Sequence, residues 1–163
     1  ENLVRFVASS ACKGLSYAHA KGLVHHDIKS GNIMLTKTRE LKLMDFGLAK
    51  FVEESRADHT QAIGTPYYIS PEQILGEALD GRSDIYSLGV TLFELSTGQV
   101  PFAKGDLTYH HLHTPPPIAS NINPDVSESI SEIVFRCMQK DPDDRFQDVE
   151  AIIEALKSNP RST

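Results

Sequence analysis

Four polar residues in two short runs of this sequence could act together on a phosphate group. Asp27, Lys29 and Asn32 lie in the run VHHDIKSGN, and Asp45 follows in the run LMDFG. An acid, a cation, an amide and a second acid are groups that could together accept a proton, neutralise phosphate oxygens and bind a metal ion, as phosphoryl transfer requires. The side-chain oxygens of Asn32 and Asp45 are ligands of the kind that Mg²⁺ prefers.

Short β elements are expected to position these residues. Residues 23–24 are apolar and predict a short buried strand that leads into the first run. Residues 32–35 and 41–44 predict a small hairpin closed by a polar turn. Residues 45–72 show little periodicity, which predicts a long functional loop.

Helices are expected to make up most of the remaining chain. An apolar stripe at helical spacing covers residues 3–21, and similar stripes over 130–138 and 149–156 predict two further helices. Residues 84–95 are apolar on nearly all sides, which predicts a helix at the centre of the domain. The fold class is therefore mainly α.

Both polar runs resemble the catalytic and metal-binding loops of protein kinases, in which the catalytic Asp and Asn precede D-F-G. The likeness continues in GTPYYISPE, residues 64–72, which is similar to the kinase segment that ends in A-P-E, with Ser70 in the place of Ala. It covers essentially the whole chain and implies one domain over residues 1–163, the C-terminal lobe of a protein kinase. We expect a helical bundle with short β-hairpins that carry the catalytic and metal-binding loops.

This resemblance implies roles for five residues. Asp27 would accept the proton of the substrate hydroxyl, and Lys29 would stabilise charge on the transferring group. Thr65 would hydrogen-bond both of them, while Asn32 and Asp45 would bind Mg²⁺ and, with it, ATP. A Lys two residues after the catalytic Asp accompanies serine/threonine kinases in this family. The expected reaction therefore transfers the γ-phosphoryl group of Mg-ATP to Ser or Thr hydroxyls of proteins.

Two apolar residues of the same region have implied roles as well. Met34 would form the floor under the adenine ring of ATP, although packing in the core explains this residue equally well. Phe46 would pack inward and set the pose of the metal-binding loop.

Three charged residues are expected to support the site without contacting substrate. The resemblance implies a buried ion pair between Glu72 and Arg145. It also implies that Asp84 hydrogen-bonds the backbone of the catalytic loop around His25.

The sequence departs from the kinase pattern in two respects. His26 stands where most kinases have an Arg that pairs with a phosphate on the activation loop, where Thr60 is the best candidate phosphosite. Histidine is mostly neutral near pH 7, so this electrostatic contact would be weak. The chain also lacks the Gly-rich loop and strand lysine of an N-terminal lobe, so we expect the segment to be inactive alone.

Cysteine and histidine positions favour structural roles. Cys12 and Cys137 lie at apolar positions of expected helices, which predicts buried thiols in a reducing cytoplasm. His110, His111 and His113 are too closely spaced to share one helix face, so a solvated helix end is favoured over a metal site.

Composition limits the partners and the location. A hydrophobic content of 40% and a charged content of 23% are ordinary for a globular domain. The net charge of -6 argues against a nucleic-acid partner, and no apolar stretch approaches the roughly 20 residues of a membrane span. The expected partners are ATP, protein substrates and an N-terminal kinase lobe. The expected location is the cytoplasm, either free or as the cytoplasmic domain of a membrane-anchored kinase.

Two other functions are compatible with the fold. A pseudokinase or scaffold would use it only for binding, but would have no chemical need for Asp27, Lys29, Asn32 and Asp45 together. A decoy lobe would bind partners through its exposed lobe interface. The sequence upstream of Glu1 would separate these alternatives, because a Gly-rich loop and a strand lysine there indicate an enzyme.

Overall fold

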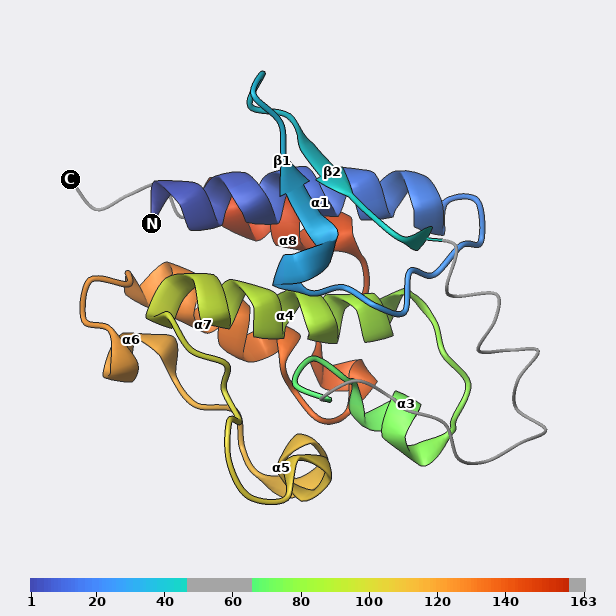
Figure 1. The fold of residues 1–163 in the computed structure, drawn as a ribbon, viewed down its shortest axis with the longest axis vertical. Coiled ribbons are helices and arrows are strands. Elements are labelled where there is room, and N and C mark those ends of the chain that lie inside the picture. The colour runs from blue at the N-terminus through green and yellow to red at the C-terminus, as the bar shows by residue number, and fades with distance from the viewer. Residues whose placement is uncertain (47–65, 159–163) are drawn as a thin grey trace.

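The computed structural model describes residues 1–46 and 66–158, which are mainly helical (Figure 1). Within these residues, two short strands form one antiparallel sheet. The elements follow in the order α1 (Asn2–His19), η1 (Ser30–Asn32), β1 (Ile33–Leu35), β2 (Leu41–Leu43), α3 (Pro71–Leu75), α4 (Gly81–Thr97), α5 (Leu107–His113), α6 (Ala119–Ile122), α7 (Glu128–Cys137), η3 (Pro142–Asp144) and α8 (Val149–Ser158).

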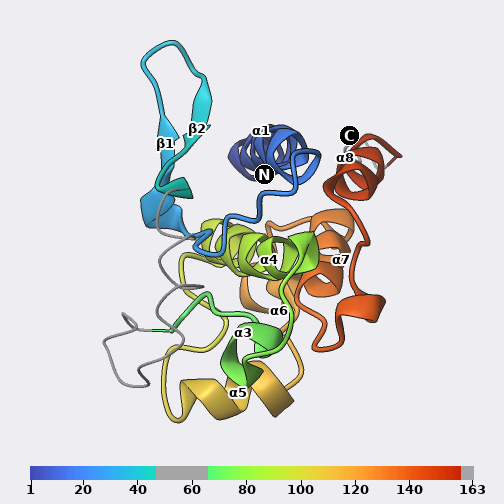
Figure 2. The same ribbon diagram turned by 90° about the vertical axis from the view of Figure 1, so that its right-hand side faces the viewer.

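Helix α4 lies at the centre of the bundle, with α1 and α7 packed against it (Figure 2). Every residue from 83 to 93 is buried. Asp80 caps the start of the helix by accepting a hydrogen bond from the Arg82 N–H, and Gly98 ends it in the left-handed conformation, at φ 78°. The predicted central helix is confirmed, because a helix that is apolar on nearly all sides is stable only inside a domain.

The close approach of α4 and α7 depends on Gly89. A Cβ atom at this position would lie 2.6 Å from Cβ of Cys137 and 2.9 Å from Cγ of Met138. Both distances are shorter than real Cβ contacts, so any side chain at Gly89 would force the helices apart. The missing side chain is therefore part of the core packing.

Helix α1 lies between the β-hairpin and α8 (Figures 1 and 2). It ends at His19, and Gly22 turns the chain with a φ of 71° while its N–H donates to the carbonyl of His19. The predicted amphipathic helix is confirmed. Its buried face consists of Val4, Val7, Ala8, Ala11, Cys12, Leu15 and Ala18.

The predicted hairpin is also confirmed and is one residue shorter in each strand than the apolar runs. Its Cα partners are Ile33 with Leu43, Met34 with Lys42, and Leu35 with Leu41. A Cβ built on Gly14 would lie 3.2 Å from Cδ1 of Leu43, so the hairpin packs directly on α1 at this glycine.

The expected buried strand at residues 23–24 is wrong. Leu23 is 48% exposed, and neither residue is in a strand. The two-stranded sheet of residues 1–46 and 66–158 provides no neighbour for this segment. Two apolar residues without a partner strand gain no ladder hydrogen bonds, and they form a connection without regular secondary structure.

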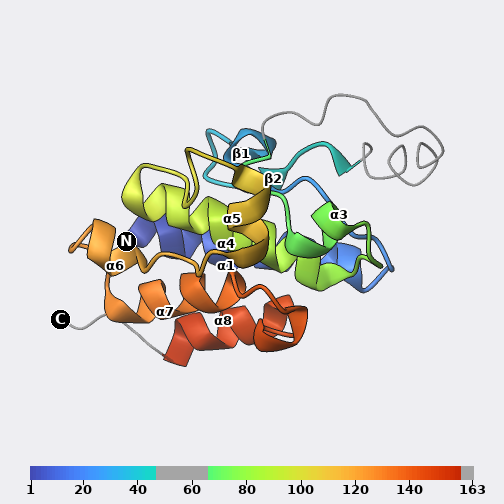
Figure 3. The same cartoon turned by 90° about the horizontal axis from the view of Figure 1, so that it is seen from below.

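The expectation of a solvated helix end for the histidine cluster is wrong for His111. Helix α5 lies across the lower side of α4 (Figure 3), and His111 is 0% exposed, with Nδ1 2.8 Å from the hydroxyl of Tyr86. Burial, followed by the nearby charge of Lys140, lowers the pKa of His111 to about 4, so the ring is neutral at physiological pH. Within the described residues, no three or more Asp, Glu, His and Cys side chains are placed together so that they could hold a metal ion.

The expected ion pair between Glu72 and Arg145 is confirmed and is buried. Nη1 and Nη2 of Arg145 donate to the two carboxylate oxygens at 2.8 and 2.9 Å. The other three N–H groups of the guanidinium donate to backbone carbonyl oxygens. All five donors of a side chain that is 0% exposed are therefore satisfied.

The pair also links stability to pH. Burial by itself raises the pKa of Glu72, but hydrogen bonds from Arg145 and Ser83 together with the charge of Arg145 lower it below the ordinary 4.5. A carboxylate whose pKa falls on folding contributes stability above the unfolded pKa. This contribution is present at neutral pH and is lost as the pH falls through the folded-state pKa.

Replacing Arg145 with Ala should lower the free energy of unfolding by about 3–5 kcal/mol, because it leaves the Glu72 carboxylate buried without its cation. Urea denaturation at neutral pH measures the change. Lys157→Ala is the control, since it breaks an exposed pair with Glu154 and should cost at most about 1 kcal/mol. An unchanged unfolding midpoint for Arg145→Ala would show that the buried pair does not stabilise the fold.

Candidate active site

Two neighbouring side chains hold the carboxylate of Asp27. Lys29 Nζ donates to Oδ2 at 2.8 Å, and Asn32 Nδ2 donates to the same oxygen at 2.9 Å and to the Asp27 carbonyl at 2.8 Å. Oδ1 has no hydrogen-bond partner among residues 1–46 and 66–158. The Asp27 side chain is 37% exposed. One carboxylate oxygen is therefore fixed, while the other is free to accept a proton from a molecule that reaches the site.

A short turn brings these three residues together. The 3-10 turn η1 begins after Lys29, and the N–H of Asn32 donates to the Lys29 carbonyl at 3.0 Å. The carbonyl of Asn32 accepts a hydrogen bond from Met44 N at 2.8 Å. Asn32 thus joins the loop of Asp27 to the segment that carries Asp45.

Asp84 anchors the loop from the central helix, as expected. Its Oδ2 accepts from the His25 N–H and its Oδ1 from the His26 N–H, both at 2.8 Å. Oδ2 also lies 2.8 Å from Nε2 of His19, a contact that the sequence did not indicate. The carboxylate is buried, so it is unavailable to water and serves the loop backbone.

His25 connects the same loop to the segment after β2. Its Nδ1 accepts a long hydrogen bond from the Asp27 N–H, at 3.3 Å. Nδ1 is therefore unprotonated, so Nε2 carries the proton and donates to the Met44 carbonyl at 2.8 Å. This fully buried ring thereby touches both segments that carry candidate residues.

Asp45 and Phe46 follow directly. Asp45 has a φ of 63°, which is uncommon for a residue other than glycine, and its side chain is exposed. The Phe46 ring centroid lies 4.3 Å from that of His25. Phe46 contacts His25 on that side but is 36% exposed, so it is only partly packed inward, and its role in setting the pose of the loop stays a prediction.

The remaining candidates have different outcomes. Met34 lies in β1 opposite Lys42 and is 44% exposed, so its role under adenine stays a prediction. Thr65 and the candidate phosphosite Thr60 lie outside the described residues.

A hydrogen-bonded chain beside the loop was not predicted. The hydroxyl of Tyr68 donates to Glu94 Oε2 at 2.7 Å and lies 3.1 Å from the Ser30 hydroxyl. Burial raises the pKa of Tyr68, so the phenol keeps its proton. These hydrogen bonds connect the loop that contains Asp27, the segment before α3 and the central helix α4. No local pattern could have indicated them, because the three residues are far apart in sequence.

Helix α3 also reaches the catalytic loop. Ser70 Oγ accepts a hydrogen bond from the Gln73 N–H, and Gln73 Oε1 accepts from the Ser70 N–H at 3.0 Å, which is a reciprocal N-terminal cap. The other end of the amide, Nε2, donates to the carbonyl of His26 at 2.9 Å. The spacing of Ser70 and Gln73 is a known capping pattern, but the contact with His26 has no sequence signal.

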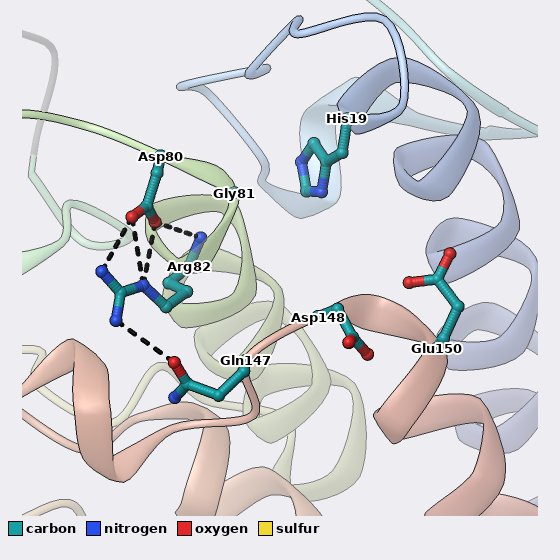
Figure 4. Close-up of a pocket in the computed structure, with 7 residues that line it drawn as sticks. All are labelled: His19, Asp80, Gly81, Arg82, Gln147, Asp148 and Glu150. Carbon is teal, nitrogen blue, oxygen red and sulfur yellow. Dashed lines mark hydrogen bonds and ion pairs between the residues drawn. The ribbon is translucent and has the colours of Figure 1, made fainter.

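A pocket of about 320 Å³ lies between the end of α1 and the starts of α4 and α8 (Figure 4). The residues that line it are His19 at the end of α1, Asp80 and Arg82 at the start of α4, and Asp148 and Glu150 at the start of α8. The guanidinium of Arg82, which lines this pocket, forms an ion pair with Asp80 at 2.8 Å. None of the candidate catalytic residues lines it, so it is separate from the site described above.

Comparisons with known proteins agree with one another. The profile of the protein kinase domain matches residues 1–158. Serine/threonine-protein kinase PknB of Mycolicibacterium smegmatis is 39% identical over 148 residues, which are 86% of this chain and 24% of the relative. Serine/threonine-protein kinase Pkn1 of Myxococcus xanthus is 39% identical over 162 residues, which are 93% of this chain and 23% of the relative.

Solved structures give the same result. The crystal structure of a variant of the PknI kinase domain from Mycobacterium tuberculosis is similar, with a TM-score of 0.73 and 27% sequence identity. The match covers 96% of this chain and 54% of that one. The chain thus spans about a quarter of the length of the curated relatives and about half of the solved kinase domain.

Removing the anchor of the loop should expose its backbone. In Asp84→Ala, the amide protons of His25 and His26 should exchange with solvent roughly tenfold faster or more, because each loses a hydrogen bond to a buried carboxylate. Hydrogen exchange measured by NMR or mass spectrometry tests this. The control is Glu154→Ala, which removes an exposed carboxylate from α8 and should leave both amides unchanged. Equal exchange in Asp84→Ala and the wild type would show that the carboxylate does not hold the loop.

Proposed function

Since the chain belongs to the protein kinase family, we propose that the full-length protein is an ATP-dependent serine/threonine kinase and that this chain is its C-terminal lobe. The observation that carries the proposal is the hydrogen bonding of the Asp27 carboxylate. One of its carboxylate oxygens is held by Lys29 and Asn32, and the other is open. A lobe that served only as a scaffold or decoy would gain nothing from this arrangement.

The reaction uses the open oxygen of Asp27 as the base. Oδ1 accepts the proton of the substrate hydroxyl while that hydroxyl oxygen bonds to the γ-phosphorus of ATP and the bond to the ADP oxygen breaks. Lys29 lies within hydrogen-bond distance of Oδ2, so its charge is close enough to stabilise the equatorial oxygens of the transferring group. Catalysis then consists of positioning and charge stabilisation, which is what this loop provides.

Asn32 and Asp45 are the residues that would hold Mg²⁺. The Asn32 amide uses Nδ2 for Asp27, which leaves Oδ1 as a ligand, and Asp45 adds an exposed carboxylate. A hard amide oxygen and a carboxylate suit Mg²⁺, which keeps waters and phosphate oxygens as its other ligands. When bound, the ion supplies positive charge to the phosphates of ATP.

Specificity for Ser and Thr is supported by two observations. Lys29 contacts the catalytic carboxylate directly, as the serine/threonine pattern of the family implies. Both curated relatives compared above are named serine/threonine-protein kinases. Thr65 is proposed as the third residue of this group. The protein substrates would be bound through Ser or Thr side chains presented to Asp27.

Exposed apolar side chains support a second lobe above the hairpin. Met34, Leu35 and Met44 lie on or beside the hairpin and are exposed. In the full-length protein, an N-terminal lobe would cover these side chains, and ATP would lie between the two lobes with Met34 beneath the adenine ring. Single apolar residues at a surface are common, but four near one site, with Phe46 as the fourth, favour an interface.

The proposed location is the cytoplasm, either free or beside a membrane anchor. Cys12 and Cys137 are both free and buried, as expected for a reducing compartment. Among the helices within residues 1–46 and 66–158, none combines the length and apolarity of a membrane span. The acidic net charge of -6 favours protein substrates over nucleic acid.

The full-length protein should transfer phosphate from radiolabelled ATP to a Ser/Thr protein substrate, whereas the purified segment 1–163 should not. Asp27→Asn and Asp45→Ala should each reduce turnover by roughly 10²-fold or more, because they remove the base and a metal ligand. Asp143→Ala removes an exposed carboxylate outside the site and is the matched control. Turnover by the segment alone that is abolished by Asp27→Asn would contradict the need for a second lobe.

The full-length kinase should depend little on activation-loop phosphorylation. The imidazole of His26 lacks the fixed charge and forked donors of Arg, and its Nδ1 is buried with no partner among the described residues. Phosphatase treatment and Thr60→Ala should therefore each leave most of the activity. His26→Arg should make activity more dependent on the phosphate. A loss of about tenfold or more on dephosphorylation, about 1.4 kcal/mol of barrier, would contradict this prediction. Lys50 and Arg56, the other cations that could bind the phosphate, lie outside the described residues.

A further inference from the structure

We propose that Gln73 is a positioning residue for catalysis: by donating a hydrogen bond to the carbonyl of His26, it fixes the peptide bond that leads into Asp27. This inference rests on the proposed function, in which Asp27 is the base. Gln73 acts through the backbone of the loop and not on the substrate.

The backbone of His26 needs support from outside the loop. Its φ is 65°, in the left-handed region that a side chain makes unfavourable. Its N–H donates to Asp84 Oδ1 at 2.8 Å, and its carbonyl accepts from Gln73 Nε2 at 2.9 Å. Both peptide groups of this strained residue are therefore held by other elements, one by α4 and one by α3.

The contact with Gln73 controls the direction of Asp27. A peptide group is planar, so the His26 carbonyl and the Asp27 N–H turn as one unit. Within residues 1–46 and 66–158, the N–H end makes one hydrogen bond, the 3.3 Å contact with His25 Nδ1, while the carbonyl end accepts from Gln73 Nε2 at 2.9 Å. Turning this plane about ψ of His26 would move Cα and Cβ of Asp27, and with them the carboxylate that Lys29 and Asn32 hold.

The amide of Gln73 can present only a donor to the loop. Its Oε1 accepts from the Ser70 N–H at 3.0 Å and from the Ser70 hydroxyl at 3.1 Å. An inverted amide would place Nε2 against these donors and Oε1 against the His26 carbonyl. Because one end of the amide is occupied by the cap, the other end is preorganised toward His26.

A purely structural role in capping α3 is the competing explanation, and Gln73→Glu separates the two. A reciprocal cap accepts Glu or Gln at this position, because only a side-chain oxygen is used. Gln73→Glu keeps that oxygen but replaces the Nε2 donor with a second carboxylate oxygen, which repels the His26 carbonyl. Ser70→Ala is the converse variant, since it removes the hydroxyl of the cap and leaves the donor to His26.

The experiment compares these variants in the full-length kinase. Rapid-quench measurements give the rate of phosphoryl transfer, and the ATP affinity and urea midpoint are measured on the same samples. Gln73→Glu should slow transfer roughly tenfold or more, with ATP affinity within about twofold and the midpoint nearly unchanged. Ser70→Ala should lower the midpoint while transfer stays within about twofold of wild type. Gln73→Met, which removes the donor without adding charge, should also slow transfer.

Each other outcome contradicts a stated claim. Wild-type transfer rates in Gln73→Glu or Gln73→Met overturn the positioning role. Equal slowing in Ser70→Ala and Gln73→Glu also overturns it, because the cap alone would then explain the effect. A wild-type protein that transfers no phosphate overturns the proposed function and this inference with it.

Discussion

The buried carboxylate of Asp84 joins the core of the domain to its reactive loop. Two consecutive loop N–H groups, those of His25 and His26, point at one carboxylate from the central helix, and His19 makes a third contact from α1. Two N–H donors left without an acceptor in this interior would each be costly, so the loop has little alternative to this path. These contacts tie the loop that contains Asp27 to the part of α4 that is buried, residues 83–93.

Helix α3 shows how tertiary contacts can hold an element that is too short to be stable by itself. Five residues cannot offset the cost of helix nucleation in isolation. The Ser70–Gln73 cap satisfies the first turn, the Glu72–Arg145 pair fixes the helix to the core, and Gln73 joins it to the loop. Ser70 thus caps the helix, Glu72 pairs with the buried Arg145, and Gln73 donates to the carbonyl of His26. Through these contacts α3 connects the core of the domain to the candidate site.

The sequence predicted features that depend on local patterns and on family motifs. Helical periodicity was sufficient for α1, α7 and α8, and a stretch that is apolar on nearly all sides was sufficient for α4. The mainly helical kinase fold expected from the motifs is confirmed by the structural match. The resemblance also supplied the Glu72–Arg145 pair, which no periodicity contains. The errors concern tertiary placement: His111 is buried because its face of a short helix meets Tyr86, and Leu23 has no strand beside it. The contact from Gln73 was missed for the same reason, because it spans distant segments.

The close contact of α4 and α7 at Gly89 restricts which substitutions the sequence can accept. A methyl group at position 89 would collide with Cys137, so neither position can gain volume while the other stays as it is. Because the contact is with Cβ of Cys137, a residue larger than glycine at position 89 requires glycine at position 137 and a shift of the Met138 side chain, so substitutions at these positions are expected to occur together. Over evolutionary time, this crossing acts as a single coupled site and should leave a trace of correlated change among homologous sequences.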